Sequence, residues 1–221
     1  MARSFAGLGT AIVTPFKGAG ELDETALRRL VRRQVQGGVD VLVPCGTTGE
    51  SVTMTADEQR RVVEITLEER GDRAVLAGAG ANDTKVAVEK TRAMASLGAQ
   101  GILSVAPYYN KPTAEGFLRH FGAVADASTV PVVVYNVPGR TGSNIDAKTM
   151  LKLAAHPNIR GVKEASGNLG QVMDILRGRP EGFEALSGDD AFTLAFMALG
   201  GEGVISVVAN QAPKEMKEVV A

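Results

Sequence analysis

Short apolar runs alternate along the chain with longer segments in which apolar residues recur every three or four positions. Several of the short runs are apolar throughout, as in Val130-Pro131-Val132-Val133-Val134. Continuous apolar runs of this length are typical of parallel strands that are covered on both faces. The pattern therefore predicts eight strands, at residues 9–14, 39–44, 74–80, 101–106, 131–136, 159–163, 183–187 and 203–207.

The longer segments carry helical spacing and helix boundary signals. Leu27, Leu30 and Val31 lie on one face of a predicted helix that Gly37 ends, and Thr55 is placed to cap the next helix. Helices are expected at residues 26–36, 55–69, 83 or 84 to 96, 114–125, 146–155, 169–177, 190–199 and from 213 to the end.

Eight strand–helix units without a long linker predict a single domain, residues 1–221, folded as a TIM (β/α)₈ barrel. The main alternative is an open doubly wound sheet. A dinucleotide-binding sheet of that kind carries G-x-G-x-x-G after a strand, and the nearest match here, Gly78-Ala79-Gly80-Ala81-Asn82-Asp83, lacks the third glycine. The barrel is therefore the preferred fold.

Composition narrows the function. The chain of 221 residues is 44% hydrophobic and 22% charged with a net charge of -1, which is ordinary for a globular protein and argues against a basic nucleic-acid footprint. No apolar stretch reaches transmembrane length, so no membrane partner is expected. Cys45 is the single cysteine, which agrees with a reducing compartment. A cytoplasmic protein is expected.

In a TIM barrel the active site lies at the carboxyl ends of the strands, so the residues that follow each apolar run are the candidates. Thr47 and Thr48 follow the second run between glycines, where hydroxyl and backbone N–H groups can bind a carboxylate or a phosphate. The same residues also suit an ordinary turn. Spacing alone does not separate these two interpretations.

All three tyrosines follow predicted strands. Tyr108 and Tyr109 come after the fourth run, and Tyr135 ends the fifth. Core tyrosines are usually packing groups with one satisfied hydroxyl. Their confinement to one end of the barrel favours instead a proton relay of phenols and a threonine hydroxyl.

Lys163 ends the sixth apolar run, where its amine must either pair with a carboxylate or lose its proton. Burial lowers the pKa of a lysine, by up to ~3–5 units when it is complete, and a neutral amine is a nucleophile for carbonyl groups. The competing interpretation is a salt bridge between Lys163 and Glu164.

Other chemistry is weakly supported. His120 and His156 fall in predicted helical regions, away from strand ends, so neither a histidine-based triad nor a metal site is expected. Cys45 is interpreted as a small buried filler. The segment Ser187-Gly188-Asp189-Asp190 could be no more than a helix cap. The segment Gly203-Val204-Ile205-Ser206 is expected to form a closely packed wall with no chemistry of its own.

Taken together, these segments resemble the dihydrodipicolinate synthase family, within the pyruvate-dependent class I aldolases that include N-acetylneuraminate lyase. Each motif alone is weak evidence for the family. The ordered set of motifs, which spans essentially the whole chain, is specific for it. Its members are Thr14-Pro15, Gly46-Thr47-Thr48-Gly49-Glu50-Ser51, Gly80-Ala81-Asn82, Tyr108-Tyr109-Asn110-Lys111-Pro112, Tyr135-Asn136-Val137-Pro138-Gly139-Arg140-Thr141-Gly142, Lys163-Glu164-Ala165, Ser187-Gly188-Asp189-Asp190 and Gly203-Val204-Ile205-Ser206.

The resemblance implies roles for eight residues. Lys163 would form a Schiff base with pyruvate, and Tyr135, Thr47 and Tyr109 would form the proton relay, with Tyr109 supplied by a neighbouring subunit. The substrate-binding residues would be Thr48 for the pyruvate carboxylate, Arg140 for the carboxylate of aspartate semialdehyde, and Gly188 and Ile205 for the pocket wall.

The implied reaction condenses pyruvate with L-aspartate 4-semialdehyde in lysine and diaminopimelate synthesis, without a metal or any other cofactor. A second hypothesis keeps the pyruvate imine but changes the aldehyde, as in N-acetylneuraminate lyase or a keto-deoxy sugar acid aldolase. A third is a barrel that binds keto acids without turnover.

The resemblance also implies a homotetramer or homodimer and a C-terminal helical segment that family members carry. This chain is expected to lack that segment. Many bacterial relatives are inhibited by lysine at a subunit interface. Ser51, Asn82 and Tyr108 match that site, whereas Ala56 and Val86 stand where His and Glu are expected. Weak or absent lysine feedback is therefore predicted.

Overall fold

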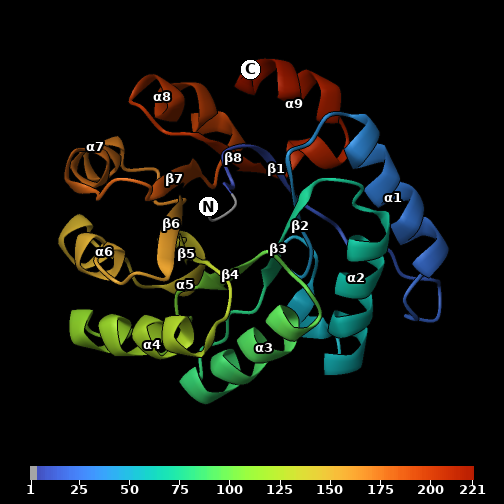
Figure 1. The fold of residues 1–221 in the computed structure, drawn as a ribbon, viewed down its shortest axis with the longest axis horizontal. Helices are drawn as coiled ribbons and strands as arrows, with labels where there is room; N and C mark the ends of the chain where they lie inside the picture. Colours follow the sequence, from blue (N-terminus) through green and yellow to red (C-terminus); the bar gives the residue numbers. More distant parts are fainter. Residues whose placement is uncertain (1–3) are drawn as a thin grey trace.

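The computed structural model describes residues 4–221, which form a closed barrel of eight parallel strands in the order of the sequence. Helices surround the strands in Figure 1, and α9 (Pro213–Val220) lies beside α1 (Glu24–Gln36), so that the first and last helices close the ring. The predicted TIM barrel is confirmed, and the open doubly wound sheet is excluded by the pairing of the first strand with the eighth. The strands are β1 (Gly7–Ala11), β2 (Val41–Val43), β3 (Ala74–Gly78), β4 (Gly101–Val105), β5 (Val132–Asn136), β6 (Ile159–Glu164), β7 (Glu184–Ser187) and β8 (Gly203–Ser206).

The helices begin where the sequence places caps. Thr55 forms a capping box with Glu58 before α2, and the side chain of Asp83 accepts from the first-turn N–H groups of α3. Gly38, with φ of 83°, follows the end of α1. The remaining long helices are α2 (Ala56–Glu69), α3 (Thr84–Ser96), α4 (Ala114–Ala127), α6 (Ala147–Ala154), α7 (Leu169–Gly178) and α8 (Thr193–Ala198).

Several element boundaries differ from the prediction, such as β2, which is shorter than residues 39–44, and three further differences are notable. The first strand is shorter and earlier than residues 9–14, because its ladder with β8 begins at Gly7. The helix expected at 190–199 is a 3₁₀ turn, η2 (Asp190–Phe192), followed by α8. A short helix, α5 (Pro138–Thr141), was not predicted. It begins at a proline, whose fixed φ suits a first helical position.

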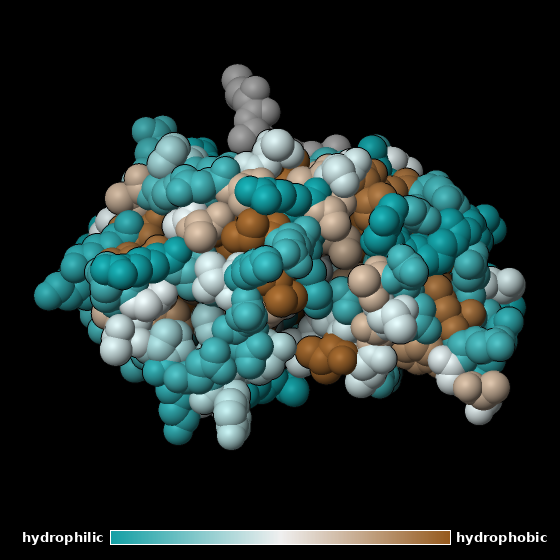
Figure 2. Space-filling view, turned by 90° about the horizontal axis from the view of Figure 1, so that it is seen from below, coloured by the Kyte–Doolittle hydropathy of each residue, from teal (hydrophilic) through white to brown (hydrophobic). Residues whose placement is uncertain are grey.

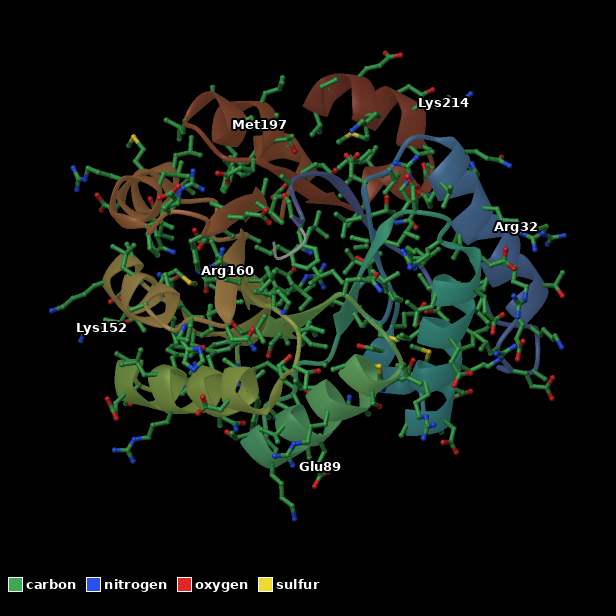
Figure 3. The ribbon with its side chains drawn as sticks, in the orientation of Figure 1. Arg32, Glu89, Lys152, Arg160, Met197 and Lys214 are labelled. Carbon is green, nitrogen blue, oxygen red and sulfur yellow. The ribbon has the colours of Figure 1, made fainter. Side chains whose placement is uncertain are left out.

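The core has two parts. Between sheet and helices lies a large apolar layer, while a smaller cluster fills the barrel interior, from Phe5 through Val133 and Leu186 to Tyr135 and Ile205. The outer helix faces are polar: Figure 3 shows Arg32, Glu89 and Lys152 on α1, α3 and α6, pointing away from the strands. On the side of the molecule seen in Figure 2, hydrophilic residues dominate and hydrophobic ones form separate small patches.

Candidate active site

Lys163 projects into the barrel because side chains alternate along a strand. Its neighbour Val162 packs in the layer between sheet and helices, and Glu164 bonds to the side chain of Gln171 on α7. Lys163 is only 5% exposed, and its Nζ lies 4.1 Å from the centre of the Tyr135 ring. Tyr135 and Lys163 are 28 positions apart in the sequence, and they are in contact because β5 and β6 pair them directly.

The amine of Lys163 has no carboxylate within salt-bridge distance among residues 4–221. The alternative salt bridge with Glu164 is therefore wrong, because the two side chains leave opposite faces of β6. Burial lowers the pKa of Lys163 to about 8; the negative charge of Asp190 opposes this shift and the positive charge of Arg140 adds to it. The structure thus holds an amine that is partly neutral near neutral pH.

Tyr135 joins this amine to a cavity of about 360 Å³. Burial raises the pKa of its phenol, so the hydroxyl keeps its proton and can donate it. Thr47, Tyr108, Arg140 and Cys45 contribute to the cavity wall, and burial raises the pKa of the Cys45 thiol to about 12. Cys45 is accordingly a buried filler, as predicted, and not a thiolate.

Gly188 and Ile205 lie against the same centre. A Cβ at Gly188 would stand 3.1 Å from Cε and Cγ of Lys163, so a side chain there would crowd the amine. Ile205 is 1% exposed and packs in the interior cluster with Tyr135. Thr48 is half-buried in the loop beside Thr47, but it does not line the cavity.

Tyr109 is a second predicted site residue that does not line the cavity. Its side chain is 90% exposed, and its backbone has φ of 70°, a left-handed conformation that is uncommon for a residue with a side chain. Its backbone N–H donates to the carbonyl of Thr141 at 3.2 Å, which ties this loop to the one that carries Arg140. Within one chain the three tyrosines therefore do not form a single relay.

Sequence reasoning missed Asp190. Its carboxylate accepts from the Ser206 hydroxyl at 2.5 Å and from the backbone N–H groups of Val207 and Val208 at 2.9 and 3.2 Å. It thereby joins the end of β7 to the end of β8 next to Lys163. The pair Asp189-Asp190 had suggested only a helix cap, and Asp189 does cap η2 through Ala191. No local signal distinguishes the two aspartates.

Among residues 4–221, no group of three or more His, Cys, Asp and Glu side chains is arranged to hold a metal ion. His120, on α4, contacts the Thr84 hydroxyl, and His156 contacts Asp126 at the carboxyl end of α4. In the same part of the chain, no helix is both long enough and apolar enough to span a bilayer.

Fold and site together define a (β/α)₈ barrel with a buried, partly neutral lysine amine at the carboxyl ends of its strands. Comparison with known proteins makes this class specific: the model of the dihydrodipicolinate synthetase family matches residues 4–221. The chain belongs to this family, as its sequence motifs predicted.

Individual relatives agree. The chain is 52% identical over 219 residues to the 4-hydroxy-tetrahydrodipicolinate synthase of Prosthecochloris aestuarii, which covers 98% of this chain and 74% of the relative. The dihydrodipicolinate synthase of Aquifex aeolicus superposes with a TM-score of 0.95 at 44% identity, covering 98% of this chain and 74% of the other. The dihydrodipicolinate synthase of Cyanidioschyzon merolae, with lysine bound, superposes with a TM-score of 0.94 at 43% identity. The match covers 97% of this chain and 74% of the other. The chain thus spans about three quarters of the length of these relatives.

Proposed function

We propose that this chain condenses pyruvate with L-aspartate 4-semialdehyde, the reaction of 4-hydroxy-tetrahydrodipicolinate synthase, through a Schiff base on Lys163. The observation that carries the proposal is the buried amine, with its pKa lowered to about 8, against the Tyr135 ring. The names of the curated relatives agree with the predicted activity. The three relatives are all named as the synthase and not as a sugar-acid aldolase.

In the first half of the reaction the neutral Lys163 amine adds to the pyruvate ketone. Loss of water then gives an iminium ion, which acts as an electron sink. The methyl group of pyruvate loses a proton and the imine becomes an enamine. Tyr135 lies where it can pass protons during these steps, and Thr47 lies on the wall of the same cavity. Thr48 and the backbone of its loop would hold the pyruvate carboxylate.

In the second half the enamine carbon attacks the aldehyde, and the amine of the bound product displaces Lys163 as the ring closes. Arg140 is the proposed partner of the aldehyde's carboxylate, because a guanidinium binds a carboxylate through two parallel N–H bonds. Gly188 leaves room beside the lysine side chain, and Ile205 supports the pocket wall.

Tyr109 completes the relay only if another subunit presents it, and we propose a homodimer or homotetramer for this reason. An aromatic side chain that is 90% exposed, on a loop in a left-handed conformation, suits an interface better than a free surface. We also propose a cytoplasmic location, in keeping with the free buried Cys45.

The acceptor assay tests the proposed function. Turnover should require pyruvate and aspartate semialdehyde together, and turnover with N-acetylmannosamine but not with the semialdehyde would contradict the proposal. Arg140→Gln should raise the KM for the semialdehyde by about 10–100-fold, the value of a charged hydrogen bond, and leave the KM for pyruvate nearly unchanged. Arg119→Gln, on the exposed face of α4, is the matched control.

Lysine inhibition is a separate prediction. A cavity of about 280 Å³ includes Ser51, Asn82 and Tyr108 in its wall, together with Ala56 and Val86. Neither Ala56 nor Val86 can pair with a lysine ammonium or carboxylate, so steady-state assays should show little inhibition. Inhibition by micromolar lysine would refute this prediction.

A further inference from the structure

The two strands that carry Lys163 and Tyr135 end in a second cross-strand pair. Asn136 follows Tyr135, Glu164 follows Lys163, and the register pairs Asn136 with Glu164 directly. Because successive side chains point to opposite faces, Tyr135 and Lys163 meet inside the barrel and Asn136 and Glu164 meet outside it, under the helices. The catalytic pair thus has a polar pair immediately behind it.

That polar pair is buried and fully hydrogen-bonded. Glu164 is 4% and Asn136 0% exposed. The Glu164 carboxylate accepts from Asn136 Nδ2 at 3.0 and 3.2 Å, from Gln171 Nε2 at 3.2 Å, and from the backbone N–H of Ser166 at 2.7 Å. Every one of these partners is an N–H donor, and no cation lies within salt-bridge distance of Glu164 among the described residues.

A buried carboxylate without a cation is costly, and its retention on a strand needs a reason. Apolar residues of similar size would cover the helix side of β6 equally well. The β5–β6 ladder contains a register shift between Val132 and Val133, so pairing at the start of these strands does not fix their ends. The Asn136–Glu164 bonds fix the strand ends at the level where the Lys163 amine must be aligned with Tyr135.

Asn136 also extends the network away from the strands. Its Oδ1 accepts from Ile145 N–H at 3.0 Å and its Nδ2 donates to Asn144 at 2.8 Å, while Asn144 donates to Gln171 at 2.8 Å. The segment that follows Arg140 and the first turn of α7 are therefore attached to the same carboxylate. Through Asn136 and Gln171, the hydrogen-bond network of Glu164 thus links β5, β6, α7 and the segment at Asn144.

Building on the proposed function, we infer that Glu164 is a positioning residue, which with Asn136 and Gln171 aligns the Lys163 amine against Tyr135 for attack on the keto acid. Glu164 touches neither substrate nor the reacting atoms. It acts through the position of β6 relative to β5.

Glu164→Gln keeps the size of the side chain but places an amide among three N–H donors, so at least one donor is left facing another donor. In the full-length protein, with pyruvate and borohydride, the rate of adduct formation per folded molecule should fall by up to about 10²-fold, the cost of misplacing a reacting group by about 1 Å. The pH of half-maximal trapping should rise, because a less buried amine retains its proton more readily.

Glu184→Gln is the matched control. Glu184 begins the next strand, at the opposite end of the barrel, and accepts from the Ser4 hydroxyl at 2.5 Å and from Phe5 N–H at 2.8 Å. This variant should lose stability without any change in trapping rate per folded molecule or in its pH profile. A role for Glu164 in stability alone would give Glu164→Gln the same behaviour as this control.

The outcomes separate the two proposals. No adduct with the unaltered protein would refute the proposed function. An adduct with that protein, and the same rate and pH profile in Glu164→Gln, would overturn the inference about Glu164. If Glu164→Gln does not fold, Gln171→Met is tested instead, because it removes one hydrogen-bond donor and leaves the carboxylate. A fall of roughly tenfold in the trapping rate per folded molecule supports the inference. An unchanged trapping rate overturns it.

Discussion

The two ends of the barrel interior have opposite chemistry. At the amino ends of the strands Phe5 closes the interior: it is 2% exposed and packs against Leu76 and so closely against Gly101 that any side chain there would overlap its ring. At the carboxyl ends the interior opens into the cavity beside Tyr135 and holds the Lys163 amine without a salt bridge. One end gains stability from complete apolar packing, whereas the other gives up stability to keep a reactive group dry.

The largest effect on activity is expected from a substitution at the open end of the barrel. Tyr135→Phe keeps the ring that packs on Lys163 and removes only the hydroxyl, so the variant should fold normally. Adduct formation with pyruvate should slow by ~10²–10⁴-fold, the usual loss for an acid–base group. Single-turnover trapping measures the rate of adduct formation, and a thermal melt checks that the variant is folded. A rate near that of the unaltered protein would remove Tyr135 from the relay.

At the closed end the effect should fall on stability instead. Phe5→Ala leaves a large cavity among buried residues and should lower the free energy of unfolding by ~3–5 kcal/mol. Urea denaturation measures this loss, and trapping per folded molecule should be unchanged. A large fall in trapping with little loss of stability would mean that the two ends are not separate in function.

Burial of the Lys163 amine should also lower the stability of the folded barrel in a way that depends on pH. The pKa of Lys163 falls from 10.5 unfolded to about 8 folded. Well below pH 8 the amine carries its proton in both states, so folding bears the full cost of burying the charge. Between pH 8 and 10.5 the unfolded chain binds more protons than the folded one, and the cost disappears as pH rises.

Lys163→Met should therefore stabilise the barrel at pH 7 by on the order of 3 kcal/mol, and this gain should vanish by pH 10.5. Urea denaturation of both proteins at the two pH values measures the difference. Equal stability at pH 7 would show that the amine is well solvated, which would contradict its proposed role.

Sequence patterns were sufficient for the barrel because short, mostly apolar runs alternate with helical segments that have clear caps, such as Thr55 and Asp83. They were also sufficient to place Lys163 and Tyr135 at the carboxyl ends of the strands, since position at the end of a strand is a local property. The family resemblance supplied roles for Thr47, Thr48 and Arg140 that spacing alone left open.

What the sequence did not reveal depends on which face a residue occupies and on contacts between distant segments. Glu164 was considered as a salt-bridge partner of its neighbour Lys163, but strand geometry places the two on opposite faces. Asp190 was considered as a helix cap, whereas its contacts with Ser206 join two strand ends. The exposure of Tyr109 depends on a loop conformation that no periodicity encodes.

The most direct test is to map the adduct that forms when the protein is treated with pyruvate and borohydride. The account predicts one added pyruvate per chain, on Lys163, with a trapping rate that rises with pH through about 8 as the amine loses its proton. Lys163→Ala should give none. An adduct on another lysine, or none in the unaltered protein, would contradict the central claim that this buried amine is the nucleophile.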